Sequence, residues 1–270
     1  MAEHAGVLGR PIAHSLSPIL HRAAYAELGL DWSYEAIECG VAELPATVAQ
    51  RADWAGFSAT MPLKHALLDL AAEVRPIAAT VGSANTLLRG PDGWIAENTD
   101  VAGIVAALAE HSVAPATVTV LGAGGTAQAM LAALLAVGVE ECTVLARDPT
   151  RAAALLATAE RLGLRVRVDH LDNAAAALTA DLVASTLPPG AADRLAEHIW
   201  RPHQSVFDVV YTPWPTPFVA SAARAGARVV SGALMLLHQA AVQVALMTGH
   251  EAPVVAMRAA LAHVAPDCGI

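Results

Sequence analysis

The residues best suited to bind a nucleotide lie near the middle of the chain, where a G-x-G-x-x-G/A pattern follows a short β-branched run. The pattern consists of Gly122, Ala123, Gly124, Gly125, Thr126 and Ala127. Gly122 permits a tight turn, Gly124 lets the backbone approach a pyrophosphate, and the small Ala127 lets a helix pack closely on the strand. The helix N-terminus then offers N–H groups and a positive dipole end to the phosphates. The pattern predicts a dinucleotide-binding turn; the structural alternative is a glycine-rich turn without a ligand.

The elements around this pattern have the order that such a turn requires. We expect a buried strand over residues 117–121, a helix over 126–137 that ends at Gly138, and a second strand over 141–147. Together they form a βαβ unit. The pattern therefore carries more weight here than it would alone.

The end of the second strand is the place where adenosine-ribose selectivity is decided. NAD sites usually place a carboxylate there, whereas NADP sites place an arginine that binds the 2′-phosphate. Arg147 comes first off the strand and Arg151 follows one turn later, so both favour NADP. Asp148 lies between them and leaves an NAD preference as the alternative.

Two ionisable residues outside this unit have positions that allow either a structural or a functional role. Residues 55–59 are predicted to form a strand and Pro62 to start the next helix, which places Lys64 in its first turn. A cation at that end of a helix opposes the helix dipole, so its position suggests a role other than capping. Asp100 precedes a helix expected over residues 101–110, and its structural alternative is to cap that helix.

Hydroxyl groups mark the first strand-to-helix turn. Ser17 has the position of an N-cap with Pro18 at the first helical position. Capping needs only one hydroxyl, so we expect Ser15 to be available for a ligand hydroxyl or carboxylate.

Amide groups mark two further places. Asn85 and Asn98 lie at either end of a hairpin, where an amide can hold a turn or bind a ligand. Gln239 lies on a long, mostly apolar helix expected over residues 233–248. A buried amide needs partners, which could be a ligand hydroxyl or a fixed protein group.

Composition excludes several classes of function. A formal net charge of -9 without a basic cluster argues against nucleic acid, so a small molecule is the expected ligand. The sequence has no uninterrupted apolar run of membrane-spanning length, and we expect no secretory leader. Cys39, Cys142 and Cys268 are scattered without metal-ligand spacing, which predicts reduced thiols, no metal and a cytoplasmic location. Oligomeric state stays open between monomer and homodimer.

Several motifs occur in one order along nearly the whole chain. They are Ser15-x-Ser17-Pro18, Thr60-Met61-Pro62-x-Lys64, Ala84-Asn85-Thr86, Asn98-Thr99-Asp100, the glycine-rich turn, a proline-rich loop over residues 211–217 and the helix with Gln239. In this combination the chain resembles the shikimate dehydrogenase family. The resemblance implies reversible reduction of 3-dehydroshikimate to shikimate with NADPH, in the pathway to aromatic amino acids.

The resemblance also implies a fold and a set of site residues. The fold has two α/β domains with an active-site cleft between them: a substrate domain of residues 1–103 completed by 238–270, and a Rossmann-type NADP-binding domain of residues 104–237. Lys64 and Asp100 would be catalytic. The substrate would be bound by Ser15, Ser17, Thr60, Asn85, Tyr211 and Gln239. NADP would be bound by the glycine-rich turn together with Arg147, Arg151, Thr186, Gly232 and Met235.

The chemistry of that reaction needs a proton donor. Hydride delivery to a ketone leaves an alkoxide that must be protonated. We expect Lys64 to act as acid and base and Asp100 to act as its partner, although a coupled pair leaves the donor open.

Two alternatives share parts of this pattern. A quinate/shikimate dehydrogenase that prefers NAD would keep every substrate motif and differ near Arg147 and Asp148. A non-catalytic NADP-binding regulatory module would have no need for both Lys64 and Asp100.

The chain departs from the family pattern at one substrate motif. The family usually has Asn-Val-Thr where this chain has Ser58-Ala59-Thr60, and only the threonine is kept.

Overall fold

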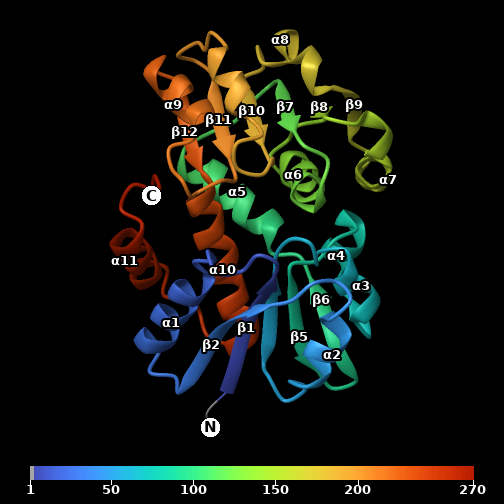
Figure 1. The fold of residues 1–270 in the computed structure, drawn as a ribbon, viewed down its shortest axis with the longest axis vertical. Helices are drawn as coiled ribbons and strands as arrows, with labels where there is room; N and C mark the ends of the chain where they lie inside the picture. Colours follow the sequence, from blue (N-terminus) through green and yellow to red (C-terminus); the bar gives the residue numbers. More distant parts are fainter. Residues whose placement is uncertain (1–2) are drawn as a thin grey trace. The chain divides into compact units, whose positions relative to one another are not determined.

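Two six-stranded sheets organise residues 3–270, the part of the chain that this computed structural model describes (Figure 1). The described chain forms two compact units. The first contains residues 3–100 and Leu237–Val264, and the second contains Val101–Leu236 and Ala265–Ile270. These divisions lie near the expected boundaries, but the last six residues belong to the second unit, where the Ser231 hydroxyl donates a hydrogen bond to the carbonyl of Cys268.

The sheet of the first unit is mixed, with strand order β2-β1-β3-β5-β6-β4. Its strands are β1 (Glu3–Gly9), β2 (Trp32–Glu38), β3 (Gly56–Ala59), β4 (Glu73–Val74), β5 (Thr86–Gly90) and β6 (Gly93–Glu97). Strand β1 pairs in parallel with β2 and β3, whereas β5 runs antiparallel to both β3 and β6. The predicted hairpin is confirmed as β5 and β6.

The helices of the first unit cover this sheet. They are α1 (Ser17–Glu27), α2 (Leu44–Ala49), α3 (Ala66–Leu70), α4 (Pro76–Val81), most of α10 (Gly232–Thr248) and α11 (Val254–Val264). Helix α11 packs beside α1, as Figure 1 shows, so the chain returns to the first unit after completing the second sheet.

The second sheet is wholly parallel, with strand order β9-β8-β7-β10-β11-β12. Its strands are β7 (Val118–Leu121), β8 (Glu141–Ala146), β9 (Arg165–His170), β10 (Leu182–Ser185), β11 (Ser205–Asp208) and β12 (Arg228–Ser231). Numbered within the unit, the order is 3-2-1-4-5-6, which is that of a Rossmann fold. The chain reverses its direction of winding between β7 and β10, and ligands of such sheets bind at the carboxyl ends of the strands there.

Helices of the second unit connect these strands. They are α5 (Asp100–Glu110), α6 (Gly125–Ala136), α7 (Ala153–Leu162), α8 (Ala174–Ala177), α9 (Pro217–Arg224) and the 3-10 turns η1 (Pro149–Arg151), η2 (Leu171–Asn173) and η3 (Asp193–Glu197). The predicted βαβ unit is confirmed as β7, α6 and β8. None of the helices in the described residues is long and apolar enough to cross a membrane.

Candidate active site

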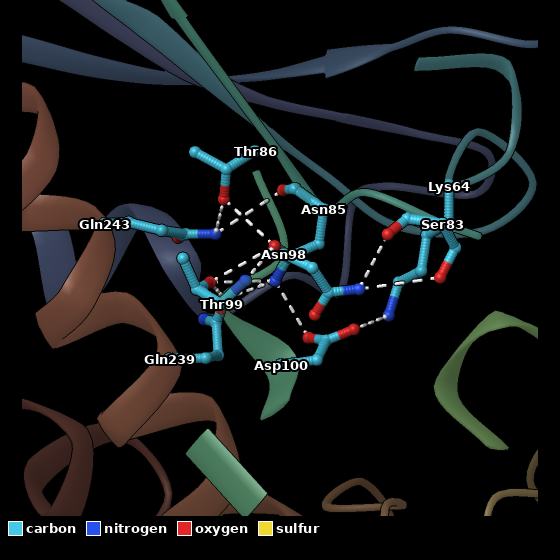
Figure 2. A network of polar contacts seen from close by, with 9 residues as sticks. All are labelled: Lys64, Ser83, Asn85, Thr86, Asn98, Thr99, Asp100, Gln239 and Gln243. Atoms are coloured by element: carbon cyan, nitrogen blue, oxygen red, sulfur yellow. Dashed lines mark hydrogen bonds and ion pairs between the residues drawn. The ribbon is translucent and has the colours of Figure 1, made fainter. Parts of the chain in front are cut away.

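An ion pair between Lys64 and Asp100 lies at the centre of the site in the first unit (Figure 2). Lys64 Nζ donates to Asp100 Oδ2 at 2.5 Å, and Asn85 Nδ2 donates to Asp100 Oδ1 at 2.8 Å. The two charged side chains are only 15% and 5% exposed. Both carboxylate oxygens of Asp100 therefore have a donor, and Asp100 has the role of a partner to Lys64 while it starts α5.

The sheet explains how residues from distant parts of the chain meet. Strands β1 and β3 are parallel neighbours, so the loop with Ser15 and the loop with Thr60 and Lys64 both leave the same edge of the sheet. Strand β5 is antiparallel to β3, so Asn85 enters at that edge, and β6 ends there just before Asp100. The backbone N–H of Arg10 joins the two loops by donating to Met61 O at 3.0 Å.

The predicted helical position of Lys64 is wrong. Helix α3 begins at Ala66, and Lys64 lies in the turn before it. Leu63 N donates to Thr60 O at 2.9 Å, and this tight turn takes up the residues that were expected to start the helix. The helix dipole therefore gives no argument for this lysine. A different signal was available, because Lys64 is the only lysine among the 16 lysine and arginine residues of the sequence.

The serines of the first turn do not have the predicted capping arrangement. Helix α1 begins at Ser17 with Leu16 in the N-cap position and no side-chain capping bond, so the prediction that Ser17 caps it is wrong. The Ser17 N–H instead donates to Ser15 Oγ at 3.3 Å. Ser15 lies one residue before the N-cap, so its hydroxyl accepts from the first residue of α1 and is not the helix cap.

Asn85 joins the polar groups around the ion pair. Its Oδ1 accepts from Thr99 N at 2.8 Å, while its Nδ2 also lies 3.2 Å from Gln239 Oε1. Gln239 is 5% exposed and its Oε1 further accepts from Thr99 Oγ1 at 3.4 Å. Gln239 thus has protein partners, as its structural alternative required, and its contact with a ligand stays a prediction.

The glycine-rich turn of the second unit has the geometry of a phosphate cradle. Gly122 has φ +108, and a Cβ there would lie 2.5 Å from Thr186 Oγ1, which donates to Leu121 O at 2.8 Å. Among the described residues, apart from the chain neighbours of Gly124, no atom lies within 4 Å of the position that a Cβ on Gly124 would take, and no side chain there caps α6. An open space in front of a helix N-terminus fits a pyrophosphate. Thr186 contributes to the shape of the turn, because its hydroxyl packs against Gly122 and bonds to Leu121 O.

Arg147 directly follows β8 and lines a hollow of about 350 Å³. Among the described residues, the hollow is lined by Arg147, His170, Leu171, Asp172, Ala191 and Arg194. Sequence reasoning missed Arg194, because only the fold brings η3 to the end of β8. Arg151 is exposed and is not part of this lining.

Asp148 is occupied within its own turn. Its Oδ1 accepts from Thr150 N at 3.1 Å and from Thr150 Oγ1 at 2.5 Å, which caps η1. These hydrogen bonds from Thr150 hold the pKa of the Asp148 carboxyl below its usual value. The capping of η1 thus explains this carboxylate without a ribose hydroxyl of NAD as its partner.

The remaining predicted residues lie in the second unit. Tyr211 follows β11 and is half-buried, and this burial raises the pKa of its phenol. Gly232 starts α10 where a Cβ would lie 2.2 Å from Val209 O, so close packing already requires glycine there. Met235 is 7% exposed. Asp208 accepts from Thr216 Oγ1 at 2.8 Å and holds the proline-rich loop.

One unit has a buried lysine–aspartate ion pair and the other is a Rossmann unit with a glycine-rich turn, and together they indicate the class of protein: a dinucleotide-dependent oxidoreductase. Residues 117–211 match the family described as "NADP oxidoreductase coenzyme F420-dependent". Residues 7–87 match "Shikimate dehydrogenase substrate binding domain", and residues 232–262 match "Shikimate 5'-dehydrogenase C-terminal domain". The chain belongs to the shikimate dehydrogenase family.

Relatives and solved structures are similar over nearly the full chain. A protein of Moorella thermoacetica named "Shikimate dehydrogenase (NADP(+))" is 36% identical over 93% of this chain and 90% of its own length. The crystal structure of Mycobacterium tuberculosis shikimate dehydrogenase is 47% identical, with TM-score 0.86 over 97% of this chain and 99% of that chain. The Thermus thermophilus shikimate 5-dehydrogenase in complex with NADP(H) and shikimate is 33% identical, with TM-score 0.84 over 97% and 99%.

Proposed function

We propose that this protein is a shikimate dehydrogenase, which reduces 3-dehydroshikimate to shikimate reversibly with NADPH. The observation that carries the proposal is the Lys64–Asp100 ion pair at the edge of a sheet whose other loops hold hydroxyl and amide groups. Such groups suit a substrate with a carboxylate and several hydroxyls.

In this proposal Lys64 Nζ donates a proton to the alkoxide oxygen that forms during reduction and takes it back in the reverse direction. Asp100 holds the ammonium group in place by the 2.5 Å contact to its Oδ2. Asn85 fixes Asp100 and, with Gln239, offers amide groups to the substrate. Ser15, Ser17, Thr60 and Tyr211 complete the substrate-binding set.

The second unit would bind NADP. The backbone from Gly122 to Ala127 would hold the pyrophosphate at the start of α6, and Arg147 would bind the 2′-phosphate beside the hollow that it lines. Arg151, Thr186, Gly232 and Met235 belong to the same proposed set. When bound, the reduced nicotinamide supplies the hydride.

A spectrophotometric assay at 340 nm tests the proposal. The purified chain is given shikimate with NADP and, separately, with NAD, and the expected result is reduction of NADP at the higher kcat/KM. A quinate arm tests the second candidate, because a quinate dehydrogenase from Corynebacterium glutamicum in complex with NAD is 27% identical with TM-score 0.86. No turnover of shikimate with either cofactor would refute the proposal.

A cytoplasmic location and a monomeric or homodimeric state, with no nucleic-acid or membrane partner, complete the proposal. The cytoplasmic location is supported by the free and buried thiols of Cys39, Cys142 and Cys268. Light scattering of the purified protein measures the oligomeric state.

A further inference from the structure

A series of buried hydrogen bonds leads from α1 to the Lys64–Asp100 pair. It begins at Tyr25, whose hydroxyl lies 3.2 Å from His21 Nδ1. It continues where His21 Nε2 lies 3.3 Å from Gln243 Oε1 and where Gln243 Nε2 donates to Thr86 Oγ1 at 2.9 Å. Thr86 Oγ1 donates to Asn85 Oδ1 at 3.0 Å, and Asn85 donates to Asp100. We call Tyr25, His21, Gln243, Thr86 and Asn85 the relay.

The direction of these bonds is set by groups that can only accept. Gln243 Nε2 lies 3.5 Å from the carbonyl oxygen of Asn85, so the nitrogen and not the oxygen of this amide faces β5 (Figure 2). Gln243 Oε1 therefore accepts from an N–H at His21 Nε2, and His21 Nδ1 accepts from Tyr25. Each member donates toward Asp100, and hydrogen bonds that share one direction polarise and strengthen one another.

The relay is closed to water. Tyr25, His21, Gln243, Thr86 and Asn85 are all at most 2% exposed. His21 also stacks on Tyr34, with ring centroids 3.9 Å apart. Burial lowers the pKa of His21 to about 3, so its ring is neutral at ordinary pH and keeps one N–H for Gln243. A member that lost its partner would be left with a buried unsatisfied polar group, which costs free energy. This cost keeps the side chains of the relay in their hydrogen-bonded positions.

We propose that His21, Gln243 and Thr86 are positioning residues, which orient the amide of Asn85 so that its hydrogen bond from Nδ2 holds Asp100 against Lys64. The inference rests on the proposed function for its kinetic consequences. The hydrogen bonds of these three side chains reach Asn85 and not the ion pair, so each acts through Asn85.

Two substitutions break the relay at different links. Thr86→Val nearly preserves shape and removes the hydroxyl, whereas Gln243→Leu removes all three hydrogen bonds of the amide. Thr86→Ser keeps the hydroxyl and serves as the conservative variant. Thr158→Val is the matched control, because Thr158 is also fully buried and accepts from a glutamine, Gln128 Nε2, at 3.0 Å in the second unit.

The first readout is independent of turnover. Because Lys64 is the only lysine, an amine-reactive N-hydroxysuccinimide ester reports on this one ε-amine, and peptide mass spectrometry separates it from the N-terminal amine. Thr86→Val and Gln243→Leu are expected to speed acylation of Lys64 several-fold, because Asp100 no longer holds the ammonium. Thr86→Ser and Thr158→Val are expected to react at the rate of the unmodified protein.

The second readout is kinetic. Displacement of a catalytic group by about 1 Å can cost on the order of 100-fold in rate, so kcat should fall about 10- to 100-fold in both relay variants while the KM for NADPH is unchanged. The deuterium isotope effect on kcat with nicotinamide-deuterated NADPH should rise, because the chemical step becomes slower. A loss of folded enzyme alone would lower kcat without changing the isotope effect or the KM.

Folded relay variants, checked by thermal melting, that acylate Lys64 at the unmodified rate would overturn the inference. So would a lower kcat with an unchanged isotope effect, which would mark the relay as structural only. If the unmodified protein does not oxidise shikimate at all, the proposed function fails, and the acylation rates still decide the relay on their own.

Discussion

The site of the first unit and the site of the second unit are built in opposite ways. Around the ion pair, Asn85, Asp100 and Gln239 are 2%, 4% and 5% exposed, and side chains hold one another in place. In the second unit the proposed phosphate site is formed by the backbone of the glycine-rich turn, and Arg147 and Gly124 are exposed. A reacting centre requires fixed groups, whereas phosphates can be bound by backbone dipoles and mobile cations.

This difference predicts how each site fails. Removing a partner from the buried site leaves an unsatisfied group and disturbs both stability and rate. Removing an exposed cation from the second site should change cofactor affinity alone. The following substitutions test that contrast, from the largest expected effect to the smallest.

Lys64→Ala should lower kcat about 10²- to 10⁴-fold, the usual contribution of a positioned acid or base. The NADPH dissociation constant, measured by fluorescence titration, should change little because the glycine-rich turn belongs to the other unit. A loss of less than about tenfold would exclude the acid–base role.

Arg147→Ala should weaken NADPH binding by about 1.5–3 kcal/mol, the scale of a hydrogen bond to a charged group, and leave NADH binding almost unchanged. Arg151→Ala and Arg194→Ala, measured in the same titration, show how much each of these two guanidinium groups contributes to NADPH affinity. Equal weakening of both cofactors by Arg147→Ala would assign it a structural role and blur the contrast between the two sites.

His21 should make the first unit sensitive to acid. Its pKa is about 3 in the folded protein against 6.5 as a free group, so the unfolded chain binds the extra proton and stability falls as pH drops below 6.5. Between pH 7 and pH 5 this group alone should remove about 2 kcal/mol of unfolding free energy.

Denaturant unfolding of His21→Phe at both pH values measures that contribution. The aromatic ring is kept, so the difference in stability between the unmodified protein and His21→Phe should shrink at pH 5. His250→Phe, at an exposed histidine, is the control. A difference that stays constant with pH would contradict a neutral buried ring.

Gly124→Ala and Gly122→Ala should separate binding from folding within one turn. A methyl group on Gly124 meets open space, so the melting temperature should not change. The same methyl group would block the approach of the pyrophosphate, so NADPH affinity should fall about tenfold, or about 1.4 kcal/mol. On Gly122 it meets Thr186 at φ +108, so the melting temperature should fall. Unchanged NADPH affinity in Gly124→Ala would argue against the cradle.

Local patterns predicted a large part of the fold. The βαβ unit and the β5–β6 hairpin follow from alternation of apolar residues and from turn residues, which act over a few positions. The return of the C-terminal helix to the first unit was expected from the family resemblance and not from a local pattern. Two local predictions were wrong, the capping role of Ser17 and the helical position of Lys64. Each depended on where a helix starts: α1 begins at Ser17 itself, and α3 begins at Ala66, two residues after Lys64.

By itself, the sequence determined which residues could do chemistry: the glycine-rich turn, the arginine after β8, and Lys64 and Asp100 with their neighbouring amides. Only the tertiary structure decided how those groups are joined. Asn85 meets Gln239 across 154 residues and Gln243 across 158 residues, while Arg194 joins Arg147 at one hollow. The reason is physical. A buried amide forms hydrogen bonds with the groups that sheet and helix packing bring within reach, and a local sequence pattern does not specify which distant groups those are.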